Sequence, residues 1–151
     1  METNDKIENA KNWASEFIRL VDEASQINSW FSSKIWVIWY SDNTVARLDP
    51  TFNLSEITSF IDNLETGGWT NFGGPINDAT TYFASNDLER DQHIILLSDG
   101  LPTVGNGWMS SIERAEYASD QAKDMGINIY TISVEQSFEW SNLMRDISSS
   151  E

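Results

Sequence analysis

Apolar residues recur every three or four positions in five stretches of the chain, which is the spacing of one buried face of an α-helix. The longest stretch runs from about Asp5 to Glu23 and predicts an amphipathic helix. The same spacing predicts helices over 54–64, from Pro75 to about 85, over 110–125 and over 138–147. Gly126 directly follows the fourth of these helices and is expected to stop it.

Four other segments have the pattern of β-strands. Three are apolar almost throughout, as in strands covered on both faces: 35–40, 93–98 and 127–134. The segment 44–49 alternates with a period of two, with Val45 and Arg47 on one face, and Pro50 is expected to break it. Ser-Asp-Asn at 41–43 fits a tight turn, so the first two strands should form a hairpin.

The predicted order of elements is helix, strand, strand, helix, helix, strand, helix, strand, helix, and in the second half buried strands alternate with helices. Such alternation requires parallel strands joined by helical crossovers. We therefore predict an α/β fold with a doubly wound, mostly parallel sheet. The length of 151 residues fits a single domain over 1–151.

Composition narrows the classes of partner. The chain has 24 acidic and 9 basic residues and a formal charge of -15, so nucleic acids and anionic lipid surfaces should repel it. Cations, basic protein surfaces and neutral glycans remain open, and the acid excess is also sufficient to keep a domain soluble. There is no cysteine, no apolar stretch of membrane-spanning length and no apolar core of a secretory signal near the first residue, so the compartment stays open.

Two loops are predicted to lie at the carboxyl edge of the sheet, where α/β proteins bind ligands. The loop TGGWTNFGG contains the hydroxyl of Thr70 and the amide of Asn71, and the loop LLSDGLPT contains the carboxylate of Asp99. Oxygen donors of this kind suit a hard divalent cation such as Mg²⁺. From local chemistry alone, Thr70 and Asp99 are equally well explained as caps of the helices that follow.

Four segments resemble landmarks of the von Willebrand factor A domain, in that family's order and spacing: KIENAKNWASEFIRLVDE, GGWTNFGGPINDA, HIILLSDGLPT and AKDMGINIYTISV. The resemblance covers nearly the whole chain. It implies a doubly wound sheet between two helical layers. It also implies binding of protein ligands through a metal ion-dependent adhesion site.

The resemblance assigns the metal-ligand positions of that site residue by residue. Thr70 corresponds to the threonine that binds the cation directly or through water, and Asp99 to the aspartate that usually binds through water. The family's Asp-x-Ser-x-Ser motif, which ends the first central strand, has no counterpart, and Met1 stands where a methionine follows that motif. We therefore expect a domain truncated at both ends, which would bind Mg²⁺, Mn²⁺ or Ca²⁺ in its complete form and weakly or not at all in this chain.

Three explanations of the absent middle strand stay open. The start could be an internal methionine, another chain could supply the strand, or the two flanking strands could pair with each other in a reduced fold. Under the first, mass spectrometry of the native protein should find peptides upstream of Met1.

The remaining candidates concern ligand contact and catalysis. Gly100 belongs to the same loop edge, and Trp69 and Trp108 lie in loops beside it, where an exposed aromatic side chain could anchor a ligand. Core packing is the default for Trp13, Trp36 and Trp39. The only histidine, His93, stands at the entry end of its strand, and phosphate-loop and nucleophile-turn motifs are absent, so we predict no enzyme.

The leading hypothesis is an adhesion-type protein-binding module with a partial metal ion-dependent adhesion site. In a complete domain, an acidic side chain of the partner would occupy the open coordination position of the cation. The alternative is a non-catalytic accessory subunit of a metal- or nucleotide-dependent enzyme assembly.

Overall fold

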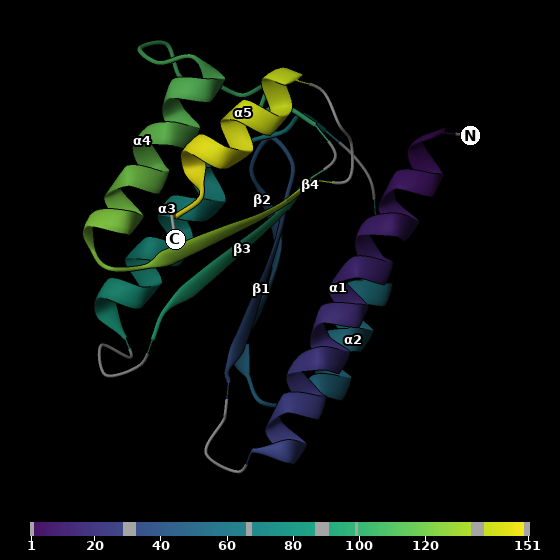
Figure 1. Cartoon of the computed structure of the whole chain (residues 1–151). Helices are drawn as coiled ribbons and strands as arrows, with labels where there is room; N and C mark the ends of the chain where they lie inside the picture. Colours follow the sequence, from purple (N-terminus) through teal and green to yellow (C-terminus); the bar gives the residue numbers. More distant parts are fainter. Residues whose placement is uncertain are drawn as a thin grey trace. The chain divides into compact units, whose positions relative to one another are not determined.

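The computed structural model describes residues 2–28, 33–65, 68–86, 91–98, 100–133 and 138–149. Within these residues the chain is a mixed α/β protein with five helices and two two-stranded sheets (Figure 1). In this described part, no helix combines the length and the hydropathy that a bilayer span requires. The chain divides into two compact units, 1–39 with 45–67 and 40–44 with 68–151.

The first unit contains α1 (Glu2–Ile27), most of β1 (Ile35–Tyr40) and of β2 (Thr44–Thr51), and α2 (Leu54–Asp62). Helices α1 and α2 lie side by side (Figure 1), and their apolar faces bury Ile18, Ile57 and Ile61. This confirms the first two helices predicted from apolar spacing.

Strands β1 and β2 are hydrogen-bonded neighbours. Only residues 41–43 join them, so the pair is an antiparallel hairpin, as predicted. Val45 and Arg47 are exposed on β2 and alternate with half-buried positions, which confirms the predicted pattern. All six residues of β1 are only half-buried, less than expected for a strand covered on both faces, because β2 is its one strand neighbour among the described residues.

The second unit contains α3 (Gly73–Ser85), β3 (His93–Ser98), α4 (Ser111–Asp124), β4 (Asn128–Ser133) and α5 (Phe138–Ile147). Strands β3 and β4 pair in parallel, with Leu96 opposite Thr131, and α4 is the crossover between them. Helices α4 and α5 lie against this sheet, and α3 lies beside α4 (Figure 1). The predicted parallel crossover is therefore present.

The core of the second unit consists of residues from all five of its elements and from the segment before α3. Its buried members are Phe72, Ile76, Leu96, Ala115, Ala118, Ala122, Ile127, Ile129, Leu143, Met144 and Ile147. The described strands form two separate pairs, β1–β2 and β3–β4. The α/β class is thus confirmed at this level.

Two element boundaries differ from the predictions at proline residues. Helix α3 begins at Gly73, two residues before Pro75, which is tolerated because an N–H in the first turn has no partner within the helix. Strand β2 continues through Pro50, which stands next to the end of the strand, where a missing ladder donor costs little.

Helix α4 has the termini that the sequence predicts. Ser110 and Glu113 form a reciprocal capping box at its start. Gly126 follows its end with φ +81, a left-handed conformation that favours glycine.

The capping box makes stability depend on pH. The Ser110 backbone N–H donates to the Glu113 carboxylate at 2.8 Å, and this bond, followed by the Ser110 side chain, lowers the pKa of Glu113. The ionised carboxylate therefore stabilises the fold above the ordinary glutamate pKa, and its contribution is lost as pH falls through the lowered folded pKa. In urea titrations, the stability difference between the unmodified chain and Glu113→Gln should be larger at about pH 7 than at about pH 3. An equal difference at both pH values would contradict this role.

Candidate functional site

The two loops predicted to carry the ligand-binding residues are hydrogen-bonded to each other. The Thr70 carbonyl accepts from the Thr103 N–H at 2.7 Å and from the Val104 N–H at 3.1 Å. The Thr70 N–H donates to the Thr103 hydroxyl at 2.9 Å. Residues 33 positions apart in sequence are therefore held together just beyond the carboxyl end of β3.

Asn71 fixes the shape of the first loop. Its side chain is almost completely buried, its amide N–H donates to the Asp42 carbonyl at 2.9 Å, and its amide oxygen accepts from the Gly74 N–H at 3.1 Å. Its backbone N–H donates to the Ser41 carbonyl at 2.8 Å. Asn71 thus connects the β1–β2 turn with the first turn of α3. Its predicted contact with a ligand stays a prediction.

Asp99 lies outside the described residues, but the chain on both sides of it is described. Ser98 is buried at the end of β3, and its hydroxyl donates to the Gly100 carbonyl at 3.3 Å and accepts from the Gly100 N–H at 3.4 Å. Nothing lies within 4 Å of the place that a Cβ would take at Gly100. The backbone is therefore open at this point of the edge.

Asp42 is an acidic side chain of this edge that the sequence analysis did not single out. It is the second residue after β1, is exposed, and accepts from the Ser41 hydroxyl at 2.7 Å. Gly68 lies beside it with φ +81, and a Cβ there would be 2.8 Å from the Ser41 hydroxyl oxygen. The reasoning that selected Asp99, an acid at the carboxyl end of an apolar strand, would also have found Asp42.

Within the described ranges, no three carboxylate or imidazole side chains are close enough together to hold a metal ion. The Thr70 hydroxyl is one oxygen donor, and the Asn71 amide is engaged with the backbone. These residues alone do not fit a divalent cation, which requires about six oxygen ligands.

The exposure of the tryptophan side chains differs from the prediction at one position, Trp13. Trp69 and Trp108 are 68% and 96% exposed, so both loop tryptophans present their rings to solvent. Trp36 and Trp39 are half-buried. The expectation of core packing is wrong for Trp13, which is 55% exposed, because five helical residues rotate it by about 140° away from the buried Ile18.

Trp108 is presented by a tight turn whose geometry depends on glycine. Asn106 and Met109 exchange backbone hydrogen bonds of 3.1 and 3.0 Å. A Cβ at Gly105 would stand 2.5 Å from the Met109 carbonyl oxygen, whereas at Gly107 it would meet nothing within 4 Å.

This contrast gives a matched pair of substitutions. Gly105→Ala should lower the free energy of unfolding by about 1–3 kcal/mol through overpacking against the backbone. Gly107→Ala should change it by about 0.5 kcal/mol or less. Urea unfolding followed by circular dichroism measures both, and equal losses would show that the turn is not as tight as described.

The loop that follows β3 is thus hydrogen-bonded to the loop between α2 and α3, at the carboxyl end of β3, the kind of edge where α/β proteins bind ligands. The von Willebrand factor type A domain matches residues 2–151. The chain therefore belongs to this family, whose members typically bind proteins and often bind divalent cations.

Solved structures show the same fold. Proximal thread matrix protein 1 from the mussel byssus superposes with a TM-score of 0.69 at 17% identity, over 94% of this chain and 36% of that one. The conserved hypothetical protein BatB from Bacteroides thetaiotaomicron superposes with a TM-score of 0.65 at 20% identity, over 94% and 74%. This chain thus spans about a third of the length of the mussel protein. No curated protein matches the sequence.

Proposed function

We propose that this chain is a non-enzymatic protein-binding module, and that its contact surface is the loop edge of Thr70, Asn71, Asp99 and Gly100. The observation that carries the proposal is the junction of the Thr70 and Thr103 loops, because it brings the two predicted ligand loops to one edge. Trp69 and Trp108 flank this edge as exposed aromatic anchors.

The edge is the adhesion-type site of the family in partial form. Thr70 and Asp99 are the positions that would take part in holding a cation, and a carboxylate of the partner would be its further ligand. The described residues do not complete the ligand set, so protein contact in this chain rests on the loops themselves. The proposal includes the doubly wound sheet of the family as the frame of this edge.

A photo-crosslinking experiment tests the proposal. A benzoylphenylalanine residue replaces Trp69 in one variant and the exposed Trp13 in a control variant, and both are irradiated in the producing cells. We expect a discrete protein adduct from position 69 that is absent from position 13 and reduced by Thr70→Ala. Equal adducts from both positions, or an adduct that Thr70→Ala leaves unchanged, would contradict the assigned surface.

The identity of the adduct decides between the two functions. An adhesive surface or matrix protein supports the module as proposed. An ATPase or a metal-dependent enzyme supports the alternative, a non-catalytic accessory subunit of an enzyme assembly.

Metal titration provides a further prediction. Calorimetric titration of the chain with Mg²⁺ or Mn²⁺ should give no binding in the micromolar range, because a cation needs more oxygen ligands than Thr70 and Asp99 supply. Thr70→Ala should therefore leave the titration unchanged. A micromolar dissociation constant that Thr70→Ala weakens would show that the chain holds a complete cation site.

A further inference from the structure

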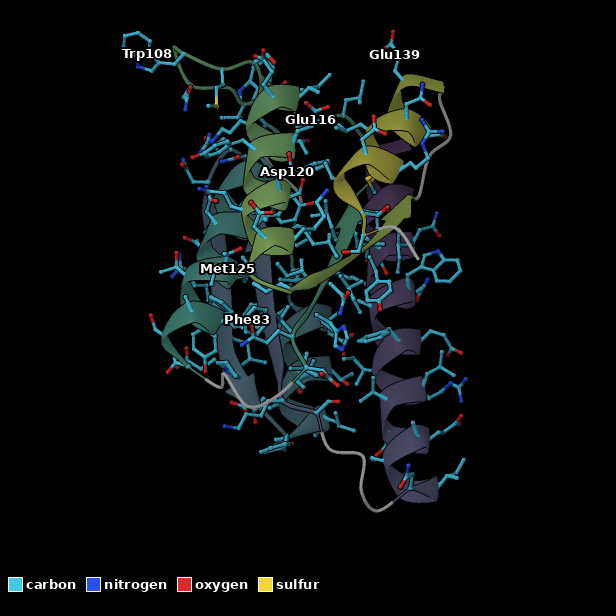
Figure 2. All side chains as sticks on the ribbon, turned by 60° about the vertical axis from the view of Figure 1, so that its left-hand side comes forward. Phe83, Trp108, Glu116, Asp120, Met125 and Glu139 are labelled. Atoms are coloured by element: carbon cyan, nitrogen blue, oxygen red, sulfur yellow. The ribbon has the colours of Figure 1, made fainter. Side chains whose placement is uncertain are left out.

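Trp108 is the most exposed large apolar side chain among the described residues, at 96%. Figure 2 shows it at the tip of its loop, beyond the start of α4 and directed away from the helices. A tryptophan in this position gains nothing from folding, since its ring stays in water. Such side chains are enriched at the centres of protein interfaces, where burial of the ring supplies much of the binding energy.

The turn that carries Trp108 is ordered before any partner arrives. The Asn106 side-chain oxygen accepts from the Trp108 N–H at 3.2 Å and from the Met109 N–H at 2.9 Å, in addition to the backbone bonds between Asn106 and Met109. The capped start of α4 follows directly at Ser110. A partner that binds Trp108 would therefore lose little free energy to ordering of the backbone. This favours a role for Trp108 in an interface.

The solvent-facing side of α4, which begins just after this turn, indicates which charge a partner should carry. Four carboxylates repeat along it at spacings of three and four: Glu113, Asp120 and Asp124, which are exposed, and Glu116, which is half-buried. Tyr117 lies on the same side and is 51% exposed. The opposite side, with Ala115, Ala118 and Ala122, is buried in the core.

Two basic residues of α4 compensate this charge only in part. Lys123 pairs with Asp120 at 3.0 Å and donates to the Asp146 carbonyl at 3.1 Å. The stem of Arg114 lies on the side of α3, where its Cγ is 2.7 Å from the place that a Cβ would take at Gly73. Figure 2 shows Glu116 and Asp120 on successive turns of α4 below the Trp108 loop.

We propose that Trp108 and the outward side of α4 (Glu113, Glu116, Tyr117, Asp120 and Asp124) form a docking surface for a lysine- or arginine-rich segment of a partner protein. A guanidinium or ammonium group stacks on the Trp108 ring, and further basic groups pair with the carboxylates along the helix. The proposal rests on the proposed function in treating the chain as a protein-binding module. It differs in requiring neither a cation nor Thr70.

The test uses a fluorescently labelled peptide of lysine, arginine and alanine, and equally long peptides in which glutamine or glutamate replaces the basic residues. Anisotropy measures binding, and ¹⁹F spectra of the chain labelled with fluorotryptophan report on Trp108, whose signal Trp108→Phe assigns. We expect the basic peptide alone to bind and to shift the Trp108 signal. Trp108→Ala should weaken binding about tenfold, and salt should weaken it further.

Matched variants separate this surface from the general acidity of the chain. Glu116→Gln with Asp120→Asn should weaken binding about tenfold, whereas Glu65→Gln with Asp49→Asn, an equal charge change at exposed positions, should leave it within about twofold. Trp13→Ala controls for loss of an exposed tryptophan. Circular dichroism verifies that each variant is folded.

Several outcomes would overturn the proposal: equal effects of the two charge pairs, binding of the glutamine peptide as tight as that of the basic one, or a Trp108 shift produced by a neutral oligosaccharide instead. Thr70→Ala and chelation with EDTA distinguish this surface from the loop edge. Both should leave peptide binding unchanged here, while Thr70→Ala reduces the crosslink from position 69. The two proposals can therefore fail separately.

Discussion

Phe72→Ala is expected to lower the free energy of unfolding by about 3–5 kcal/mol, the cost of removing a buried aromatic ring and leaving a cavity. Phe72 is completely buried immediately before α3 and makes an edge-to-face contact with Tyr40, with ring centroids 6.1 Å apart. Tyr40 in turn donates its hydroxyl to the Leu97 carbonyl on β3 at 3.0 Å. Phe72 therefore packs in the core next to the loop edge and helps to hold it in place.

Phe52→Ala is the matched control, since Phe52 is 51% exposed and the Lys34 ammonium lies 5.6 Å from the centroid of its ring. Its loss should be about 1 kcal/mol or less. Chemical denaturation followed by circular dichroism measures both variants. Comparable losses would show that the core beneath the loop edge is not closed in the way described.

Asn71→Ala should have the other large effect, a loss of about 2–6 kcal/mol, because it leaves two backbone groups without their partners at about 1–3 kcal/mol each. These groups are the Asp42 carbonyl and the Gly74 N–H. The variant should also increase amide hydrogen exchange in the Thr70 loop, since the loop loses its anchor to the β1–β2 turn.

Asn63→Ala is the corresponding control. Asn63 is exposed and its amide makes one bond, to the Ser59 carbonyl at 2.7 Å. The loss there should be about 1 kcal/mol or less, with exchange in the Thr70 loop unchanged. If Asn71→Ala were as mild as Asn63→Ala, Asn71 would not anchor the edge.

Local patterns predicted the elements well where one rule dominated. The strand around Val45 and Arg47 was predictable because its residues alternate with a period of two. The end of α4 was predictable because a positive-φ position favours glycine, here Gly126. The start of α3 was less predictable. Pro75 marks the first turn of a helix without fixing which residue of that turn it occupies, and here the helix begins at Gly73.

The arrangement of the edge was predictable only in outline. The order of elements predicted that the Thr70 loop, after a helix, and the Asp99 loop, after a strand, lie at one edge of the sheet. The bonds from Thr70 to Thr103 join residues 33 apart, and no local pattern encodes such pairs. The burial of Asn71 likewise depends on the β1–β2 turn, which contributes the Asp42 carbonyl. The position of Trp108 in a loop was predictable from sequence, whereas the turn closed by Asn106 and Met109 that presents its ring was not.

The central claim is that Thr70 and Asp99 meet at one edge, and cysteine cross-linking tests it most directly because the chain contains no cysteine of its own. Thr70→Cys with Asp99→Cys should form a disulfide, or react with a short bifunctional thiol reagent, rapidly and in the folded state. The control pair, Thr70→Cys with His93→Cys, uses the other end of β3, roughly 20 Å along the strand, and should cross-link slowly. If the control pair cross-linked as fast as the Thr70–Asp99 pair, the two residues would not share an edge and the proposed binding surface would not exist.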